Sequence, residues 1–412
     1  MLMLIPLFLN EGEQGYWYTF GSMAALLVLA DLGFTQILLN FSSHEFSKLK
    51  MGEHHLLEGD VYDISTIGSL YRFAMQWAGA IALIGLPIVS FTGYALLARD
   101  AQSEEIMWLI PWLIYSVSSS IIFFTNFTLS FVEGLEQVGN IQKIRARTSM
   151  VSFGVSVSFL ASGLGLYSLA LGSITNALIC TFWTFIKYRF VLRQMLSHSR
   201  SQEGNWSKEI FPLLSRYAVS WVGGGLASSM LIPTAFFFHG AKIAGQVGLS
   251  IALYTAIIGI SGTWITVILP KMNILIARGD RSELRNMFAM HFKLTIATYI
   301  LGCMGVFFLL VLLSDVFEFV DRLVSTPSLI LLMVGCLMHS ALGPIAIFLR
   351  AHKKEPLMVM SLVMGCIVSI STVLAGKYLI DDFYFVGYTF GSVIALLWTL
   401  TIFRKYWGIE VE

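Results

Sequence analysis

The sequence predicts an all-α polytopic membrane protein with about 12 transmembrane helices, and two observations support this. Hydrophobic residues make up 56% of the 412 residues and charged residues only 12%, whereas a soluble domain carries about 25% charged residues. Apolar runs also recur along the whole chain, and most are long enough to cross a bilayer, which takes about 20 helical residues. After a short run at 1–9 they lie at 16–41, 72–98, 106–132, 149–171, 174–196, 211–238, 246–270, 289–314, 328–349, 357–377 and 383–403. Lipid is therefore the expected solvent.

The basic residues are distributed unevenly among the loops between these runs. One set of alternate loops holds only Arg99, Lys242, Arg322 and Lys377, and the rest of the 26 Lys and Arg lie in the other set. Cytoplasmic loops are enriched in Lys and Arg. We therefore expect both termini to lie in the cytoplasm.

The first run is too short for the crossing that this topology requires. Residues 1–9 would span only about 13 Å as a helix, at 1.5 Å per residue. We therefore expect the first transmembrane helix to be truncated, with its start missing from this chain.

A polar and basic stretch from Lys187 to Lys208 divides six segments from six. Such a linker between equal halves suggests two six-helix bundles, residues 1–200 and 201–412. A weak internal similarity fits this division. GEQGYWY at Gly12–Tyr18 resembles AGQVGLSIALY at Ala244–Tyr254, which holds the equivalent place in the other half.

The sequence contains no pattern typical of an enzyme or of a metal site. It has no phosphate-binding P-loop, no HExxH, no GxSxG and no metal-ligand spacing of Cys and His. The adjacent His54 and His55 fit a solvated loop better than a metal site, and the apolar spacing from Leu56 to Ile67 predicts a short amphipathic helix on the inner membrane face. We expect no catalytic residue, no cofactor, no metal and no nucleic-acid partner.

Several ionisable residues lie within or at the ends of the apolar runs. Asp31 is the deepest acid, and a carboxylate in hydrocarbon costs about 2.5–3.5 kcal/mol. Its side chain should therefore face protein or water, either in a hydrogen bond between helices or in a cavity. His339 is in mid-segment and fits a neutral hydrogen-bonded imidazole or a proton carrier. The others lie nearer the ends of their runs: Arg72, Glu133, Arg216, His239 and Arg350.

Four stretches resemble the Wzx-type O-antigen and polysaccharide flippases of the multidrug/oligosaccharidyl-lipid/polysaccharide exporter superfamily. These stretches are LADLGF at Leu29–Phe34, FVEGLEQVGNIQKIRAR at Phe131–Arg147, HGAKIAGQVGLS at His239–Ser250 and LPKMNILIARGDRSELRNMF at Leu269–Phe288. The resemblance implies two facing six-helix bundles and alternating access. It also implies ion-driven transport of an undecaprenyl-pyrophosphate-linked oligosaccharide from the cytoplasmic to the periplasmic leaflet of a bacterial inner membrane, with polysaccharide polymerase and assembly proteins as partners.

With this resemblance, the polar residues of the segments gain expected roles. Pyrophosphate needs cations in a polar cavity, and the candidates are Arg216, Arg72 and Arg350. Asp31 and His339 are candidates for proton or ion coupling. Candidates for binding sugar hydroxyls are Gln36, Asn40, Gln76, Asn126 and Tyr217.

The sequence also allows alternatives to a flippase. One is an ion-coupled small-molecule or drug antiporter of the same superfamily. Another is a membrane partner protein that transports nothing itself. A major-facilitator transporter fits less well, because the loop SHEFSKLKMGEHHLLEGD after the second segment lacks the Asp-Arg-x-Gly-Arg type of signature.

Overall fold

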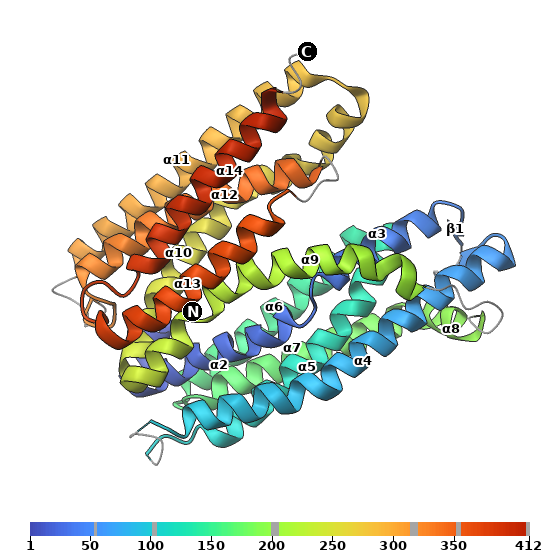
Figure 1. The fold of residues 1–412 in the computed structure, drawn as a ribbon. Coiled ribbons are helices and arrows are strands. Elements are labelled where there is room, and N and C mark those ends of the chain that lie inside the picture. Colours follow the sequence, from blue (N-terminus) through green and yellow to red (C-terminus); the bar gives the residue numbers. More distant parts are fainter. Residues whose placement is uncertain (53–55, 101–104, 199–205, 314–319, 352–355, 409–412) are drawn as a thin grey trace. The chain divides into compact units, whose positions relative to one another are not determined.

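The computed structural model describes residues 1–52, 56–100, 105–198, 206–313, 320–351 and 356–408 (Figure 1). His54 and His55 lie outside the described residues, and so does the side chain of Arg216. The elements in chain order are α1 (Leu4–Phe8), α2 (Glu11–Leu29), α3 (Phe34–Phe46), β1 (Lys50–Met51), β2 (Leu57–Glu58), α4 (Val61–Leu97), α5 (Leu109–Val132), the π-helical turn η2 (Glu133–Gln137), α6 (Val138–Ala161), α7 (Tyr167–Lys187), α8 (Arg189–His198), α9 (Trp206–Ser229), α10 (Leu231–Arg278), α11 (Arg281–Leu313), α12 (Thr326–Ala351), α13 (Met358–Tyr378) and α14 (Val386–Gly408).

Long apolar helices dominate the part of the chain that the structure describes. Eight helical stretches there are long and apolar enough to cross a membrane. Two of them, Leu109–Ala161 and Tyr217–Leu269, have 53 residues each and contain a break, at Leu135–Glu136 and at Gly240 respectively. At 1.5 Å per residue, 53 residues reach about 80 Å, which suffices for two crossings of a core about 30 Å thick.

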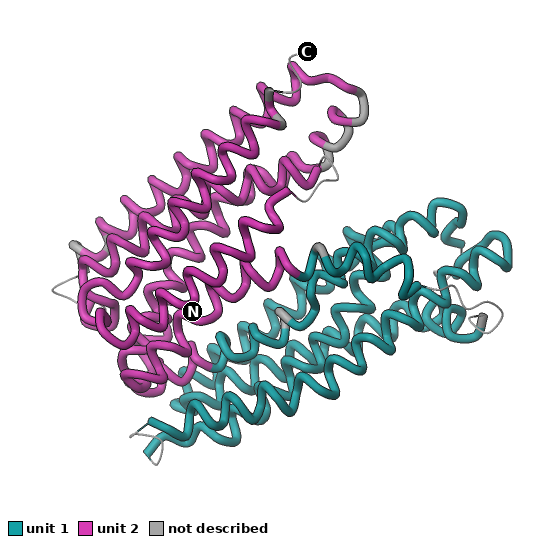
Figure 2. The backbone as a smooth tube through the Cα atoms, viewed as in Figure 1, with its two compact units in different colours: residues 1, 20–218 teal, residues 2–19, 219–412 magenta. Residues whose placement is uncertain are grey.

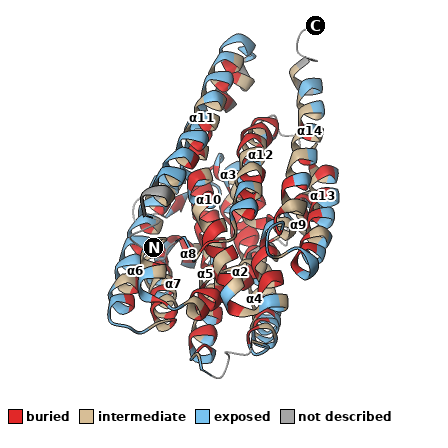
Figure 3. Cartoon of the chain, turned by 90° about the vertical axis from the view of Figure 1, so that its left-hand side faces the viewer, coloured by how far each residue is buried: buried red, intermediate tan, exposed pale blue. Residues whose placement is uncertain are grey.

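The apolar side chains of these helices remain largely uncovered by protein. Only 17% to 39% of the most apolar window of each stretch is buried. Leu83 on α4 is 78% exposed, Val267 on α10 is 72% exposed and Phe307 on α11 is 69% exposed. Figure 3 shows exposed residues along much of α11. Water would not solvate so much apolar surface, so the structure confirms the predicted all-α polytopic membrane fold.

The chain forms two compact units, and Figure 2 colours them separately. Unit 1 comprises residues 1 and 20–218, and unit 2 comprises residues 2–19 and 219–412. The boundary between the units therefore falls inside α2 and inside α9. The start of α2 belongs to the second unit, a division that no linker in the sequence marks.

Glycines let helices approach closely within each unit. In unit 1, a Cβ on Gly93 of α4 would lie 2.1 Å from the ring of Trp112 on α5, and the Trp112 indole N–H donates to the Ser90 carbonyl at 3.1 Å. In unit 2, a Cβ on Gly365 of α13 would lie 2.2 Å from the carbonyl oxygen of Gly223 on α9. Close packing through small residues is the usual way for helices to associate in lipid.

Several predicted elements differ from the structure. The amphipathic helix expected over Leu56–Ile67 is wrong, because Leu57 pairs with Met51 in a two-residue antiparallel hairpin and helix α4 starts at Val61 and runs to Leu97. Asp60 caps α4 by accepting the Tyr62 N–H at 2.9 Å. The C-terminal end of the segment predicted over 149–171 is also wrong. Helix α6 ends at Ala161, and Gly163 and Gly165 adopt positive φ in the turn that follows.

A side-chain clamp holds the hairpin against α8, and Figure 1 shows β1 and α8 at the same end of α4. The Gln194 side chain accepts the Leu57 N–H at 2.9 Å and donates to the Leu57 carbonyl at 2.8 Å. A Cβ on Gly68 would lie 2.8 Å from the Met195 carbonyl oxygen, so α4 and α8 also touch directly. These contacts hold the hairpin, α8 and α4 together at one end of unit 1.

Candidate functional site

The second predicted segment is a broken helix, not the continuous helix expected over 16–41. Helix α2 ends at Leu29, and α3 begins at Phe34. Between them, Leu32 has φ 55° and Gly33 has φ 78°, which is the left-handed region. Leu32 has no glycine-like freedom there, so this conformation costs about 1–2 kcal/mol and must be held by its surroundings.

Asp31 holds the start of the second half-helix. Its carboxylate accepts the Thr35 N–H at 3.1 Å and the Thr35 hydroxyl at 2.7 Å, and its side chain is only 5% exposed. A new helix start leaves backbone N–H groups without partners, and a carboxylate is a favoured acceptor for them. Irregular backbone at membrane depth is tolerated only inside protein or beside a water-filled cavity. The break therefore marks a place shielded from lipid.

Aromatic rings pack beneath the break. Phe34, fully buried, has its ring centroid 5.7 Å from that of Phe127 and 5.9 Å from that of Trp77. Trp77 in turn makes an edge contact at 5.6 Å with Phe211 of α9. A Cβ on Gly33 would lie 3.5 Å from the Tyr217 Cβ, so α9 also lies against the turn itself. The break is thus braced from α4, α5 and α9.

Helix α3 continues from the break with a polar exposed face. Gln36, Asn40, Ser43 and His44 are exposed and follow helical spacing along one side. The opposite side is buried and mainly apolar, with Phe34, Ile37, Leu38, Ser42 and Phe46. A lipid-facing helix would carry apolar side chains on its exposed face, as α4 does at Leu83 and Ile84. The exposed face of α3 is therefore built for water or for a polar ligand.

The π-helical turn η2, which follows α5, packs against the buried side of α3. Glu133, 7% exposed, accepts the Arg145 guanidinium at 2.9 Å and the Gln142 amide at 3.1 Å. A Cβ on Gly134 would lie 1.9 Å from the Ser42 hydroxyl oxygen, so only glycine permits this approach. The motif FVEGLEQVGNIQKIRAR thus contains the glycine that contacts α3 and both members of the Glu133–Arg145 ion pair.

The start of α2 packs on α10 within unit 2. A Cβ on Gly15 would lie 1.9 Å from the Ala241 carbonyl oxygen, and the Gln14 side chain donates to the Gly245 carbonyl at 2.9 Å. Lys242 pairs with Glu11 at 2.8 Å. The two stretches that resemble each other in sequence, Gly12–Tyr18 and Ala244–Tyr254, therefore lie against each other.

Eight of the ten predicted site residues fall into three groups. Asp31, Gln36, Asn40 and Tyr217 lie at the break or on the α3 helix that follows it, all in unit 1. Gln76 is exposed on α4, and Asn126 is half-buried on α5. His339 and Arg350 are both exposed on α12, which belongs to unit 2.

The predicted cations differ in their surroundings. The Arg72 guanidinium donates to the Leu196 carbonyl at 2.9 Å, near the C-terminal end of α8, where a cation is favourable. Arg216 belongs to α9, but its side chain lies outside the described residues. Nearby, the Trp206 indole N–H donates to the Ser69 hydroxyl at 2.8 Å, which ties the start of α9 to α4.

Sequence reasoning missed the break and the partner of Asp31. The signal was present in Asp31-Leu32-Gly33, an acid and a glycine in an otherwise apolar run, but the hydrophobic pattern continues on both sides. It also missed the Glu133–Arg145 pair, because the two residues are separated by a turn whose geometry no motif specifies.

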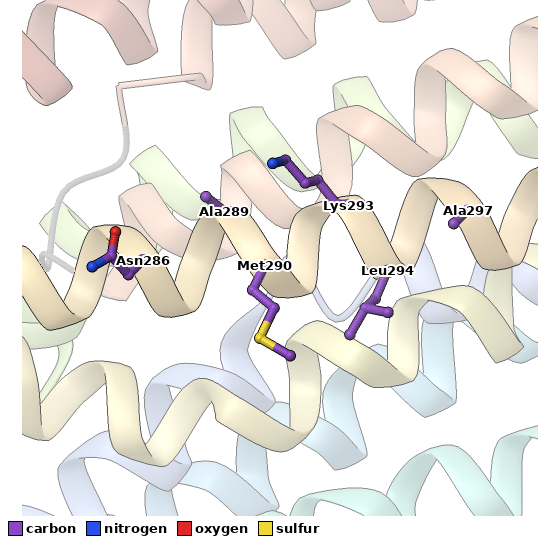
Figure 4. Close-up of a pocket in the computed structure, with 6 residues that line it drawn as sticks. All are labelled: Asn286, Ala289, Met290, Lys293, Leu294 and Ala297. Carbon is purple, nitrogen blue, oxygen red and sulfur yellow. The ribbon is translucent and has the colours of Figure 1, made fainter.

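A pocket lies beside α11, but its lining is a weaker candidate for a ligand site. It has a volume of about 460 Å³ and is lined by Asn286, Ala289, Met290, Lys293, Leu294 and Ala297. All of these belong to one helix, and Figure 4 shows Lys293 pointing to the opposite side from Met290 and Leu294. Polar groups do not converge there as a ligand site would require.

Comparison with solved structures shows the fold. Over 98% of this chain and 83% of the other, the structure is similar to the lipid II flippase MurJ in an inward closed conformation, with a TM-score of 0.62 and 13% identity. An inward-facing multidrug resistance MATE family transporter of the MOP superfamily matches with a TM-score of 0.58 and 12% identity, over 100% of this chain and 95% of that one. A MOP superfamily transporter from Pyrococcus furiosus matches with a TM-score of 0.53 and 11% identity, over 100% and 91%.

The chain therefore has the fold of MOP-superfamily transporters. This agrees with the superfamily that the sequence motifs resemble. No family model matches the sequence, and no curated protein matches it. The three solved structures named above are those of one flippase and two transporters.

Proposed function

We propose that this protein is an alternating-access flippase. Its substrate is an undecaprenyl-pyrophosphate-linked oligosaccharide, the repeat unit of an O-antigen or another surface polysaccharide. It moves this substrate from the cytoplasmic to the periplasmic leaflet of a bacterial inner membrane. The observation that carries the proposal is the broken helix at Asp31–Gly33, followed by the polar exposed face of α3, in a fold whose long helices expose many apolar side chains.

The polar face suits a glycan. Sugar hydroxyls both donate and accept hydrogen bonds, and the amides of Gln36 and Asn40 offer both functions one helical turn apart. Gln76, Asn126 and Tyr217 are proposed to extend this surface. Such groups facing lipid would be costly, whereas a translocation path for sugars needs them.

The diphosphate needs cations. Arg216 is proposed to load it, because it lies next to Tyr217, whose Cβ faces the turn at Gly33. Arg72 and Arg350 are proposed to assist. Arg72 already donates to Leu196, but guanidinium has five N–H donors and can hold a phosphate oxygen as well.

Ion coupling is proposed to use Asp31 and His339. Asp31 is buried at the break, so gain or loss of a proton there changes a charge that protein, and not water, must stabilise. A change in that charge would bias the turn between α2 and α3. His339 offers an exposed imidazole on α12 in unit 2.

Complementation of a flippase-null strain tests the proposal. The wild-type chain should restore surface polysaccharide, and Gln36→Ala with Asn40→Ala should abolish it at equal protein abundance. Asn286→Ala removes an exposed amide from α11 and serves as the matched control, with wild-type polysaccharide expected. Arg216→Ala should also lose polysaccharide. Wild-type levels from the Gln36/Asn40 variant would contradict the proposed glycan path.

A drug antiporter is the second candidate, and one observation favours it. Asp31 is a buried carboxylate, which can exchange a proton for an organic cation, and multidrug transporters share the fold. Expression in a drug-sensitive strain separates the two functions. Resistance without polysaccharide rescue would support the antiporter.

A further inference from the structure

A basic pocket opens between α6 and α7 of unit 1. It has a volume of about 410 Å³. Its lining residues are Asn140, Lys143, Ile144, Arg147, Trp183, Ile186 and Lys187.

Three cations converge on this pocket. Lys143 and Arg147 lie one turn apart on α6, Lys187 ends α7, and all three are exposed. Among the residues that the structure describes, no carboxylate pairs with any of them, whereas their neighbour Arg145 is paired with Glu133. Like charges gathered at one pocket repel each other, so an anion bound between them would relieve this repulsion.

The remaining wall of the pocket is apolar. Ile144, Trp183 and Ile186 stand beside the cations, and tryptophan favours the boundary between headgroups and acyl chains. Beyond the pocket the two helices expose further apolar side chains, including Met150 at 74% on α6 and Phe182 at 61% on α7. A ligand with a phosphate at one end and hydrocarbon at the other matches both parts.

We propose that this pocket binds the phosphate of an anionic phospholipid, with the acyl chains lying along α6 and α7. Basic pockets between transmembrane helices are suited to such headgroups. The cations supply the charge, and Asn140, whose amide donates to Gln137 at 2.7 Å, is fixed at the rim. This site is independent of the proposed flippase function, because it requires only that the protein lies in a membrane.

Lipid retention measures the site directly. The full chain is reconstituted in nanodiscs of equal phosphatidylglycerol and phosphatidylcholine, extracted in mild detergent, and its retained lipids are counted by native mass spectrometry. We expect phosphatidylglycerol to be enriched on the wild type. Lys143→Gln, Arg147→Gln and Lys187→Gln together should remove the enrichment, with each substitution weakening binding about fivefold.

A second triple variant controls for net charge. Lys50→Gln, Lys208→Gln and Lys405→Gln remove the same charge from exposed positions outside the pocket, and this variant should retain phosphatidylglycerol as the wild type does. Lys143→Arg with Lys187→Arg should also retain it. Equal enrichment on the wild type and the pocket variant would overturn the proposal. So would displacement of phosphatidylglycerol by millimolar inorganic phosphate, because the site would then take phosphate without a lipid.

Discussion

Asp31 combines a structural and a proposed functional role in one side chain. Its carboxylate satisfies the N–H and the hydroxyl of Thr35, and this explains why a charge persists deep in an apolar run. A structural cap needs an acceptor oxygen but no charge, whereas ion coupling needs the charge. The two roles can therefore be separated by substitution.

Asp31→Asn keeps an acceptor oxygen for Thr35, and Asp31→Ala does not. We expect Asp31→Ala to lower the free energy of unfolding by about 1–2 kcal/mol and Asp31→Asn to change it by less than about 0.5 kcal/mol. Both should lose transport. Thermal unfolding in detergent and complementation measure the two effects. Normal polysaccharide from Asp31→Asn would show that the cap is the whole role of Asp31.

The contributions of Glu133 and Arg145 to the free energy of unfolding should be coupled. Arg145→Met leaves the buried Glu133 carboxylate without its cation and should lower the free energy of unfolding by about 1–3 kcal/mol. The loss is smaller than for a fully buried pair because the Arg145 side chain is 35% exposed. Glu133→Gln added to Arg145→Met should recover most of this loss. Arg193→Met, at an exposed position on α8, is the control and should be neutral. Additive losses in the double variant would show that the pair is not coupled.

At the scale of elements, the break between α2 and α3 is the feature that sequence periodicity could not supply. Apolar residues continue through Leu32, and a period of 3.6 is compatible with one long helix. The break depends instead on backbone conformation, which the Thr35 contacts and the packing of Phe34 and Tyr217 select. Similarly, the turn after Ala161 was missed because small residues such as Gly163 occur freely inside membrane helices.

Gly33→Ala tests the turn. Gly33 has φ 78°, where a side chain is strained, although its Cβ would meet Tyr217 at an ordinary 3.5 Å. We expect Gly33→Ala to lower the free energy of unfolding by about 1 kcal/mol through backbone strain alone. Gly79→Ala, in the middle of α4 with nothing within 4 Å, should be neutral or slightly stabilising. Equal thermal midpoints for the two variants would contradict the left-handed turn.

At the scale of the whole molecule, composition and hydropathy were sufficient to predict the all-α polytopic fold, because lipid imposes long apolar helices on any chain that spans it. The motifs led to the superfamily whose fold the structure shares. The candidate site was predicted only in part. Asp31, Gln36 and Asn40 come from one predicted segment, whereas only tertiary packing brings Tyr217 of α9 to the break.

The predicted orientation can be tested by cysteine labelling. In a background with Cys366 replaced by serine, Asp382→Cys should react with a membrane-impermeant maleimide on intact spheroplasts. Ser282→Cys should react only after permeabilisation, because Ser282 lies in one of the Lys- and Arg-rich loops that are expected in the cytoplasm. Both positions are exposed. The reverse pattern would place the termini outside the cytoplasm.

Flipping in proteoliposomes measures the central proposal most directly. Undecaprenyl-pyrophosphate-linked oligosaccharide is incorporated in both leaflets, and a membrane-impermeant reagent oxidises the glycans that are exposed outside. With the wild-type protein under an ion gradient, we predict that oxidation proceeds beyond the outer leaflet toward the whole pool, and that the Gln36→Ala/Asn40→Ala variant stops at the outer leaflet. Oxidation that stops at the outer leaflet with the folded wild-type protein would contradict the proposed flippase.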